Sequence, residues 1–105
     1  MAFKIIYCNE RIHTYLQKLE TPLAQKAFEL IEDLAHNGNR LDLIHTKTRC
    51  EHIFKIRVKS PRHSLRVFYT FVGENLYILH AYIKKDQRTR NKELDLAVKR
   101  LRSIG

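Results

Sequence analysis

The sequence predicts an α+β domain with the element order β-α-α-β-β-β-α. Three patterns carry this prediction: two stretches of helical periodicity near the start, three stretches of strict alternation from residue 53 onwards, and a last helical stripe. A chain of 105 residues with 44% hydrophobic side chains can fill one core, so we expect a single domain spanning residues 1–105. We expect an antiparallel sheet with an N-terminal helical hairpin packed on one face and a C-terminal helix.

The first part of the chain predicts one strand and two helices. The segment Phe3 to Tyr7 is rich in β-branched and aromatic residues, which favours a strand. Asn9 is a suitable N-cap for a helix. The apolar residues of that helix recur at helical spacing and are Ile12, Tyr15, Leu16 and Leu19. Thr21 and Pro22 supply a cap and a proline at the first helical position of a second helix, which ends at Gly38.

The first two alternating stretches predict a pair of strands. Residues 39–50 show no clear period and are expected to form a loop. Alternation then begins at Ile53, and the charged residues of this strand share one face; they are Lys55, Arg57 and Lys59. Ser60 to His63 predicts a turn, and Ser64 to Val72 a second strand.

The end of the chain predicts a hairpin and a helix. Gly73 to Asn75 is expected to form a three-residue loop, with Asn75 in the left-handed conformation. The strand Leu76 to Ile83 then places four side chains on one side, namely Leu76, Ile78, His80 and Tyr82. Thr89 is a candidate cap for the last helix, whose apolar stripe is Leu94, Ala97, Val98 and Leu101.

The net charge of +9 lies entirely in the second half of the chain. Residues 1–52 hold 7 basic and 7 acidic side chains, whereas residues 53–105 hold 13 basic and 4 acidic ones. A sustained positive field on one part of a small domain suggests a polyanionic partner. The candidates are RNA, DNA, an anionic membrane surface and an acidic protein segment.

Turn lengths predict which residues face each other across the three strands. The four-residue turn places Arg57 opposite Arg66, and Lys55 opposite Phe68. The hairpin places Arg66 opposite Tyr82, and Phe68 opposite His80. Like charges that face each other destabilise a sheet by about 0.2–1 kcal/mol, which is easier to explain if an anion binds between them. The alternative is a solvated face that blocks edge-to-edge aggregation.

Further cations and rings surround this predicted cluster. Phe68 and Tyr82 offer stacking surfaces for bases among the charges. The flanking cations expected to bind RNA are Lys59, Arg62, Lys84, Arg88, Arg90 and Lys92. The stretch Lys84 to Lys92 by itself could be a phosphate-binding patch or a solvated loop.

Several other classes of protein are disfavoured. The carboxylates of the basic half are few, and the six histidines show no metal-ligand spacing, so we expect neither a metal nor a cofactor. Cys8 and Cys50 form no C-x-x-C pair, which fits a reducing cytoplasm. No apolar run approaches the length of a membrane span, and the N-terminus lacks a signal-peptide stretch. We therefore expect a cytoplasmic protein without a membrane partner.

From about Ile53 the chain resembles the RelE/ParE toxin superfamily, particularly its HigB-like, phage-associated branch. The matching stretches are Phe54-Lys55-Ile56-Arg57, Leu65-Arg66-Val67-Phe68-Tyr69, the run I-L-H-A-Y-I-K-K from Ile78, and the run E-L-D-L-A-V-K-R from Glu93. These motifs cover about half of the chain, and the predicted element order agrees with the fold of the superfamily. The spacing between R-V-F-Y and L-H-A-Y-I-K-K is typical of the branch.

The resemblance implies a type II toxin that cleaves mRNA on the ribosome. Its implied partners are a cognate antitoxin, expected to be a helix-turn-helix protein, and the ribosome with its mRNA. Such enzymes cleave without a metal, because the RNA 2′-hydroxyl attacks the adjacent phosphate and leaves a 2′,3′-cyclic phosphate and a 5′-hydroxyl. Arg66, and then Arg57, would stabilise the phosphorane. Lys55 would act as the base, and Lys85 would stabilise or protonate the leaving oxygen.

Two departures from the family pattern leave the acid–base pair open. HigB-like members usually carry Glu at the position of Lys55, which here follows the RelE pattern. RelE-type toxins place a tyrosine a few residues beyond the position of Lys85, and that role is here either missing or passed to Tyr82 or His80. Two alternative functions also stay open. These are a ParE-like inhibitor of DNA gyrase and a catalytically inactive nucleic-acid-binding relic.

Overall fold

The computed structural model describes residues 2–38, 45–47, 53–84 and 91–104. The elements are β1 (Lys4–Tyr7), α1 (Glu10–Gln17), α2 (Thr21–Asn37), β2 (His45–Lys47), β3 (Phe54–Lys59), β4 (Ser64–Val72), β5 (Asn75–Ile83) and α3 (Asn91–Ile104). The predicted order is confirmed except for β2, which lies in the segment expected to be a loop. A three-residue strand is too short to show an alternating pattern, so periodicity does not detect it.

The sheet is mixed, with the strand order β1-β5-β4-β3-β2. Strands β2 to β5 pair in antiparallel fashion, but β1 pairs with β5 in parallel, from Lys4 opposite Asn75 to Tyr7 opposite Ile78. The prediction of a purely antiparallel sheet is therefore wrong at this edge. The chain between β1 and β5 includes the two N-terminal helices, and a crossover of that kind allows parallel pairing where a tight hairpin does not.

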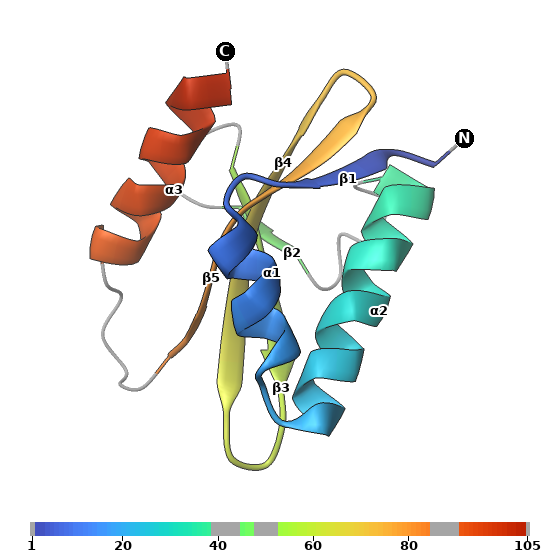
Figure 1. The fold of residues 1–105 in the computed structure, drawn as a ribbon, viewed down its shortest axis with the longest axis vertical. Helices are drawn as coiled ribbons and strands as arrows, with labels where there is room; N and C mark the ends of the chain where they lie inside the picture. Colours follow the sequence, from blue (N-terminus) through green and yellow to red (C-terminus); the bar gives the residue numbers. More distant parts are fainter. Residues whose placement is uncertain (1, 39–44, 48–52, 85–90, 105) are drawn as a thin grey trace.

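Helices cover both faces of the sheet (Figure 1). The helical hairpin of α1 and α2 packs on one face, as predicted, and its core includes Leu16, Leu23, Ile31, Val67 and Ile78. On the other face α3 packs over a second core, formed by Ile53, Phe68, Leu79 and Ala97. Val67 and Phe68 are neighbours on β4, and successive strand residues point to opposite faces. The two cores therefore lie on opposite sides of the sheet.

The helix ends follow the predicted signals only in part. The Asn9 side chain accepts a hydrogen bond from the backbone N–H of Arg11 at 2.9 Å, which confirms the N-cap of α1. In α2 the N-cap is Glu20 rather than Thr21, and no side-chain hydrogen bond caps the helix. Pro22, expected at the first helical position, is the second residue of α2, where its fixed φ suits a helix and its missing N–H needs no partner.

The β4–β5 hairpin departs from the prediction at two places. Its turn has two residues, Gly73 and Glu74, so Val72 pairs with Asn75 rather than Leu76. The positive φ of 61° belongs to Gly73 and not to Asn75, which is the pattern of a turn with glycine at its first position. A β-bulge then inserts one extra residue, Leu79, because its flanking pairs are Tyr69 with Ile78 and Phe68 with His80.

The extra residue of the bulge offsets the shorter turn, so the predicted pairing beyond the bulge is still correct. It also changes which residues of β5 share a face of the sheet. Arg66 pairs with Tyr82, and Phe68 with His80, as predicted. However, Leu76 and Ile78 belong to the core under the helical hairpin, whereas His80 and Tyr82 lie on the face of α3. The prediction that these four share one side is therefore wrong, because the alternation shifts at Leu79.

Candidate functional site

Three adjacent strands gather the predicted cationic cluster on one face of the sheet. Arg57 on β3 lies opposite Arg66 on β4, which lies opposite Tyr82 on β5. In the neighbouring row, Lys55 lies opposite Phe68, which lies opposite His80. We call these six residues the cationic face: Lys55, Arg57, Arg66, Phe68, His80 and Tyr82. The register confirms the grouping that the turn lengths predict.

Arg66 is the central residue of the cationic face and is buried, with 7% of its surface exposed. Its Nε and Nη1 atoms are buried and have no hydrogen-bond partner among the described residues. Burial, followed by the charge of Arg57, lowers the pKa of its guanidinium, which nevertheless stays charged at neutral pH. Unsatisfied buried donors cost free energy, and a guanidinium satisfies them best with a pair of anionic oxygens. Arg66 is therefore suited to bind a phosphate.

Lys55 is half-buried in the adjacent row and has a perturbed pKa. Burial lowers the pKa of its ammonium, and the charges of Arg57, Arg66 and Lys84 lower it further. A lowered pKa raises the fraction of neutral amine at physiological pH. Lys55 is therefore the group of the cationic face best suited to accept a proton.

Tyr82 is the third polar group of the row that contains Arg66. Burial raises the pKa of its phenol, and the charge of Arg66 opposes that rise. Its ring lies 5.8 Å from the ring of Phe68, and 5.7 Å from the ring of His80 with only 17° between the planes. Tyr82 thus stays protonated at neutral pH, and its ring has an aromatic neighbour on two strands.

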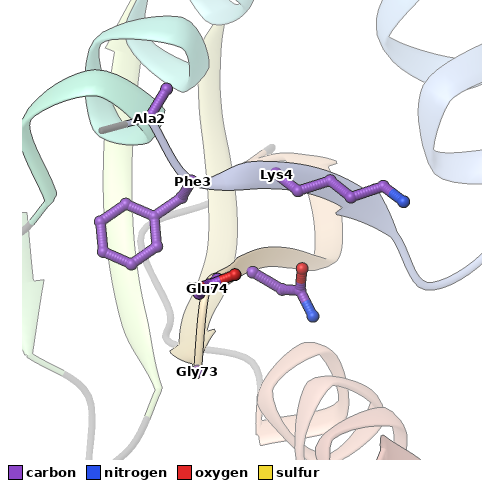
Figure 2. Close-up of a pocket in the computed structure, with 6 residues that line it drawn as sticks. Ala2, Phe3, Lys4, Gly73 and Glu74 are labelled. Atoms are coloured by element: carbon purple, nitrogen blue, oxygen red, sulfur yellow. The ribbon is translucent and has the colours of Figure 1, made fainter.

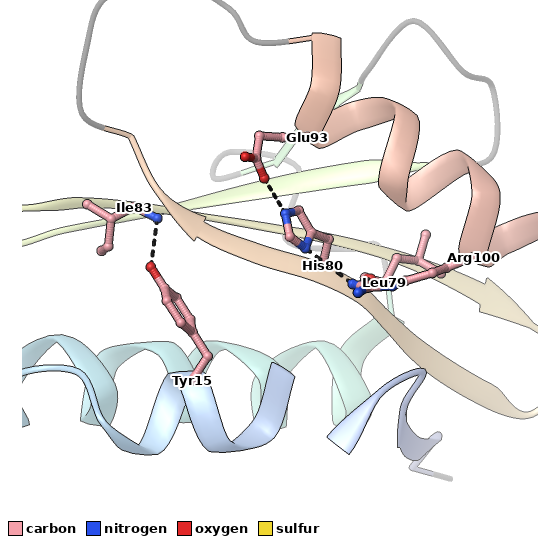
Figure 3. A network of polar contacts seen from close by, with 6 residues as sticks. All are labelled: Tyr15, Leu79, His80, Ile83, Glu93 and Arg100. Carbon is pink, nitrogen blue, oxygen red and sulfur yellow. Dashed lines mark hydrogen bonds and ion pairs between the residues drawn. The ribbon is translucent and has the colours of Figure 1, made fainter. Parts of the chain in front are cut away.

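His80 is held from α3 through both ring nitrogens (Figure 3). Its Nε2 contacts the carboxylate of Glu93, and its Nδ1 lies 3.2 Å from Nη1 of Arg100. The same Nη1 donates a hydrogen bond to the carbonyl of Leu79 at 2.7 Å. Sequence reasoning missed Glu93 and Arg100 as site residues. Their spacing of seven, with Ala97 between them, is the signal that places them on one stripe of α3.

Comparison with known proteins now identifies the family of this chain. Residues 14–102 match the family described as phage derived protein Gp49-like. The chain belongs to that family. The solved structure of a mutant of E. coli toxin RelE in the free state has a TM-score of 0.70 and 16% sequence identity, and the match covers 96% of this chain and 99% of that chain. This likeness confirms the predicted RelE-like fold. No curated protein matches the sequence.

In this Gp49-like protein, Phe68 does not offer an exposed stacking surface. Its side chain is 3% exposed and lies in the second core with Leu79 and Ala97. The expectation that a base stacks on Phe68 is therefore wrong for this conformation. The reason is that α3 packs over this part of the sheet, which the alternation along β4 does not reveal. Phe68 instead supports the ring of Tyr82.

The structure describes four of the predicted RNA-binding cations of the Gp49-like protein, namely Lys59, Arg62, Lys84 and Lys92. Lys59 at the end of β3 and Arg62 in the following turn are exposed. Lys84 follows β5, and its backbone N–H donates a hydrogen bond to the carbonyl of Ser64. The positive charge of Lys84 contributes to lowering the pKa of Lys55. Lys92 is exposed in the first turn of α3. The other two predicted RNA-binding cations, Arg88 and Arg90, lie outside the described residues, as does Lys85, which is predicted to be catalytic.

A separate pocket of about 300 Å³ lies between the start of β1 and the β4–β5 turn (Figure 2). Its lining residues are Ala2, Phe3, Lys4, Gly73, Glu74 and Asn75, none of which belongs to the cationic face. Among the described residues, no group of three His, Cys, Asp or Glu side chains is placed to hold a metal ion. No helix in the described part of the chain is long and apolar enough to cross a membrane.

Proposed function

We propose that this Gp49-like protein is the toxin of a type II toxin–antitoxin system and that it cleaves mRNA on the ribosome. The observation that carries the proposal is Arg66, a buried guanidinium that faces Arg57 and Tyr82 and has two donors without a partner among the described residues. Such a site suits a phosphodiester, because the cations are already held in place when negative charge develops on the phosphorus oxygens. The RelE-like fold supports the proposal, since the solved structure that shares it is described as a toxin.

The proposed reaction is a transesterification in which the RNA supplies its own nucleophile. Lys55 takes the proton of the 2′-hydroxyl, and the freed oxygen forms a bond to the adjacent phosphorus. The bond from phosphorus to the 5′-oxygen then breaks, and that oxygen takes a proton from Tyr82 or from Lys85. The products are a 2′,3′-cyclic phosphate and a 5′-hydroxyl. Arg66 and Arg57 hold the charge of the phosphorane, so this step uses neither a metal nor a cofactor.

The remaining cations extend this site along the RNA. The proposed contacts of the phosphate backbone are Lys59, Arg62, Lys84, Arg88, Arg90 and Lys92. Backbone contacts of this kind supply affinity without reading the sequence, and they fit a substrate that the ribosome presents. A cognate antitoxin, proposed to be a helix-turn-helix protein, would keep the toxin inactive in the cytoplasm. Within the superfamily we propose the HigB-like branch.

Induced expression in bacterial cells tests this proposal. We expect the wild type to arrest growth and to cut ribosome-bound mRNA in a purified translation system. Arg66→Ala should lower the cleavage rate by about 100-fold or more, the usual effect of removing a donor to a developing oxyanion. Arg11→Ala removes an exposed cation of α1 and is the matched control, which should cleave like the wild type.

Three results would contradict the proposal. DNA damage with intact messages would indicate an inhibitor of DNA gyrase. RNA binding without growth arrest or cleavage would indicate an inactive relic. Unchanged cleavage by Arg66→Ala would show that the site lies elsewhere.

A further inference from the structure

The ring of His80 has a defined tautomer because of its two neighbours on α3. Arginine has only hydrogen-bond donors, so Nδ1 of His80 accepts the bond from Arg100. The proton of the neutral ring therefore sits on Nε2, where it is donated to the carboxylate of Glu93. Both ring nitrogens are occupied by protein groups, and 14% of the side chain is exposed. His80 thus has no free nitrogen with which to exchange a proton with a substrate.

Arg100 also holds the bulge that determines which way His80 and Tyr82 face. Its Nη1 donates both to Nδ1 of His80 and to the carbonyl of Leu79, the extra residue of β5. Without the extra residue in the pairing, His80 and Tyr82 would not lie opposite Phe68 and Arg66. A single guanidinium on α3 thus contacts both the backbone of the bulge and the ring that follows it.

The ring of His80 in turn lies against the ring of Tyr82. The two rings are stacked with 17° between their planes and a centroid distance of 5.7 Å. Tyr82 lies directly opposite Arg66, so a change in the direction of its side chain changes where its hydroxyl lies relative to the guanidinium. The chain of contacts runs from Glu93 and Arg100, through His80, to Tyr82.

We propose that Glu93 and Arg100 are positioning residues that fix the tautomer and ring plane of His80, and that His80 acts on the reaction by orienting Tyr82 rather than by transferring a proton. This proposal rests on the proposed cleavage activity. It assigns α3 a function in the site besides covering the second core. Misplacement of a reacting group by about 1 Å can lower the rate by about 100-fold. Loss of the contacts that position Tyr82 should therefore lower the cleavage rate by a measurable amount.

Kinetics of purified full-length variants provide the first test. Glu93→Ala should lower kcat by about 10–100-fold and change KM by less than about twofold, because the RNA-binding cations are untouched. Glu93→Gln keeps an oxygen that can accept the proton of Nε2, so it should recover most of the lost rate. Arg100→Ala should behave like Glu93→Ala. The controls are two exposed residues of the same helix, Asp95→Ala and Arg102→Ala, which should match the wild type.

Nuclear magnetic resonance provides a second test that needs no activity. The ¹⁵N shifts of the wild type should show that His80 carries its proton on Nε2, and the Tyr82 ring protons should shift in Glu93→Ala but not in Asp95→Ala. A proton on Nδ1, unchanged Tyr82 shifts, or equal rates for Glu93→Ala and Asp95→Ala would overturn the positioning proposal. If the wild type does not cleave, the proposed function fails, while these spectra still decide the positioning of Tyr82.

Discussion

Arg57 and Arg66 lie directly opposite each other on the antiparallel strands β3 and β4. Arg57 is exposed and Arg66 is buried, so solvent screens the first charge far better than the second. Facing strand residues have their Cα atoms only about 4.5–5.5 Å apart, so both guanidinium groups can reach one anion. The same pair that opposes folding would therefore supply the affinity of the proposed phosphate site, which would link the stability of the protein to its ligand.

Replacing Arg66 by methionine should therefore stabilise the protein. Arg66→Met removes a buried cation whose Nε and Nη1 donors no described residue satisfies, and it removes the like-charge pair with Arg57. It keeps a long flexible side chain in the same place. We expect the free energy of unfolding to rise by about 1 kcal/mol in urea titrations. Arg11→Met, on an exposed part of α1, should leave it unchanged. A loss of stability in Arg66→Met would show that the guanidinium is satisfied within the fold.

Inorganic sulfate should stabilise the wild type through the same residue. An anion that binds only the folded state adds RT ln(1 + [L]/Kd), about 1.4 kcal/mol at ten times Kd. We expect the midpoint of thermal unfolding to rise with sulfate in the wild type and much less in Arg66→Met. A control in sodium chloride at equal ionic strength distinguishes sulfate binding from the general screening of charges by salt. Equal sulfate responses in the two proteins would place the anion site elsewhere.

The grouping of the cationic face could be predicted from sequence because it depends on local rules. Alternation assigns each side chain of β3 and β4 to a face, and a four-residue turn sets Arg57 opposite Arg66. The pairing of Arg66 with Tyr82 was also predicted, but only because two errors cancel. The turn is one residue shorter than predicted, and the bulge at Leu79 adds that residue back. The bulge itself has no signal in the alternation of a mostly apolar strand.

The features that depend on long-range packing could not be predicted in this way. Helical periodicity gives α3 an apolar stripe but does not say which face of the sheet the stripe covers. The burial of Phe68 and the contacts of His80 both follow from that choice. The parallel pairing of β1 likewise depends on where the helical hairpin returns the chain. These are relations between distant segments, which local patterns do not contain.

We expect the backbone conformation at the C-terminal end of α2 to require a glycine at position 38. Its φ of 64° and ψ of −152° define a conformation that is essentially restricted to glycine. A Cβ added there would lie 3.5 Å from Cε2 of Phe3, an ordinary contact, so the strain comes from the backbone alone. We expect Gly38→Ala to lower the free energy of unfolding by about 1–3 kcal/mol. Asn37→Ala, one residue earlier in the helix, should change it by less than about 0.5 kcal/mol. Equal effects would show that the backbone at position 38 relaxes without strain.

Lys55 should make stability depend on pH in the alkaline range. Its pKa in the folded protein is lower than the ordinary value of 10.5, so between the two values the unfolded chain binds more protons than the folded one. The contribution of Lys55 to the free energy of unfolding therefore increases as the pH rises from the pKa of Lys55 in the folded protein towards 10.5. Lys55→Gln should remove that increase, which urea titrations at a series of pH values measure. The same slope in both proteins would show that the pKa of Lys55 is not lowered.

Lys55 should also determine how cleavage depends on pH. If its neutral amine is the base, the rate of the wild type increases with pH until Lys55 is mostly deprotonated. Lys55→Arg keeps the positive charge but does not release its proton below about pH 12. We therefore expect RNA binding to change by less than about threefold, while the single-turnover cleavage rate falls by about 100-fold or more. Retained cleavage with the same pH profile in Lys55→Arg would exclude Lys55 as the base.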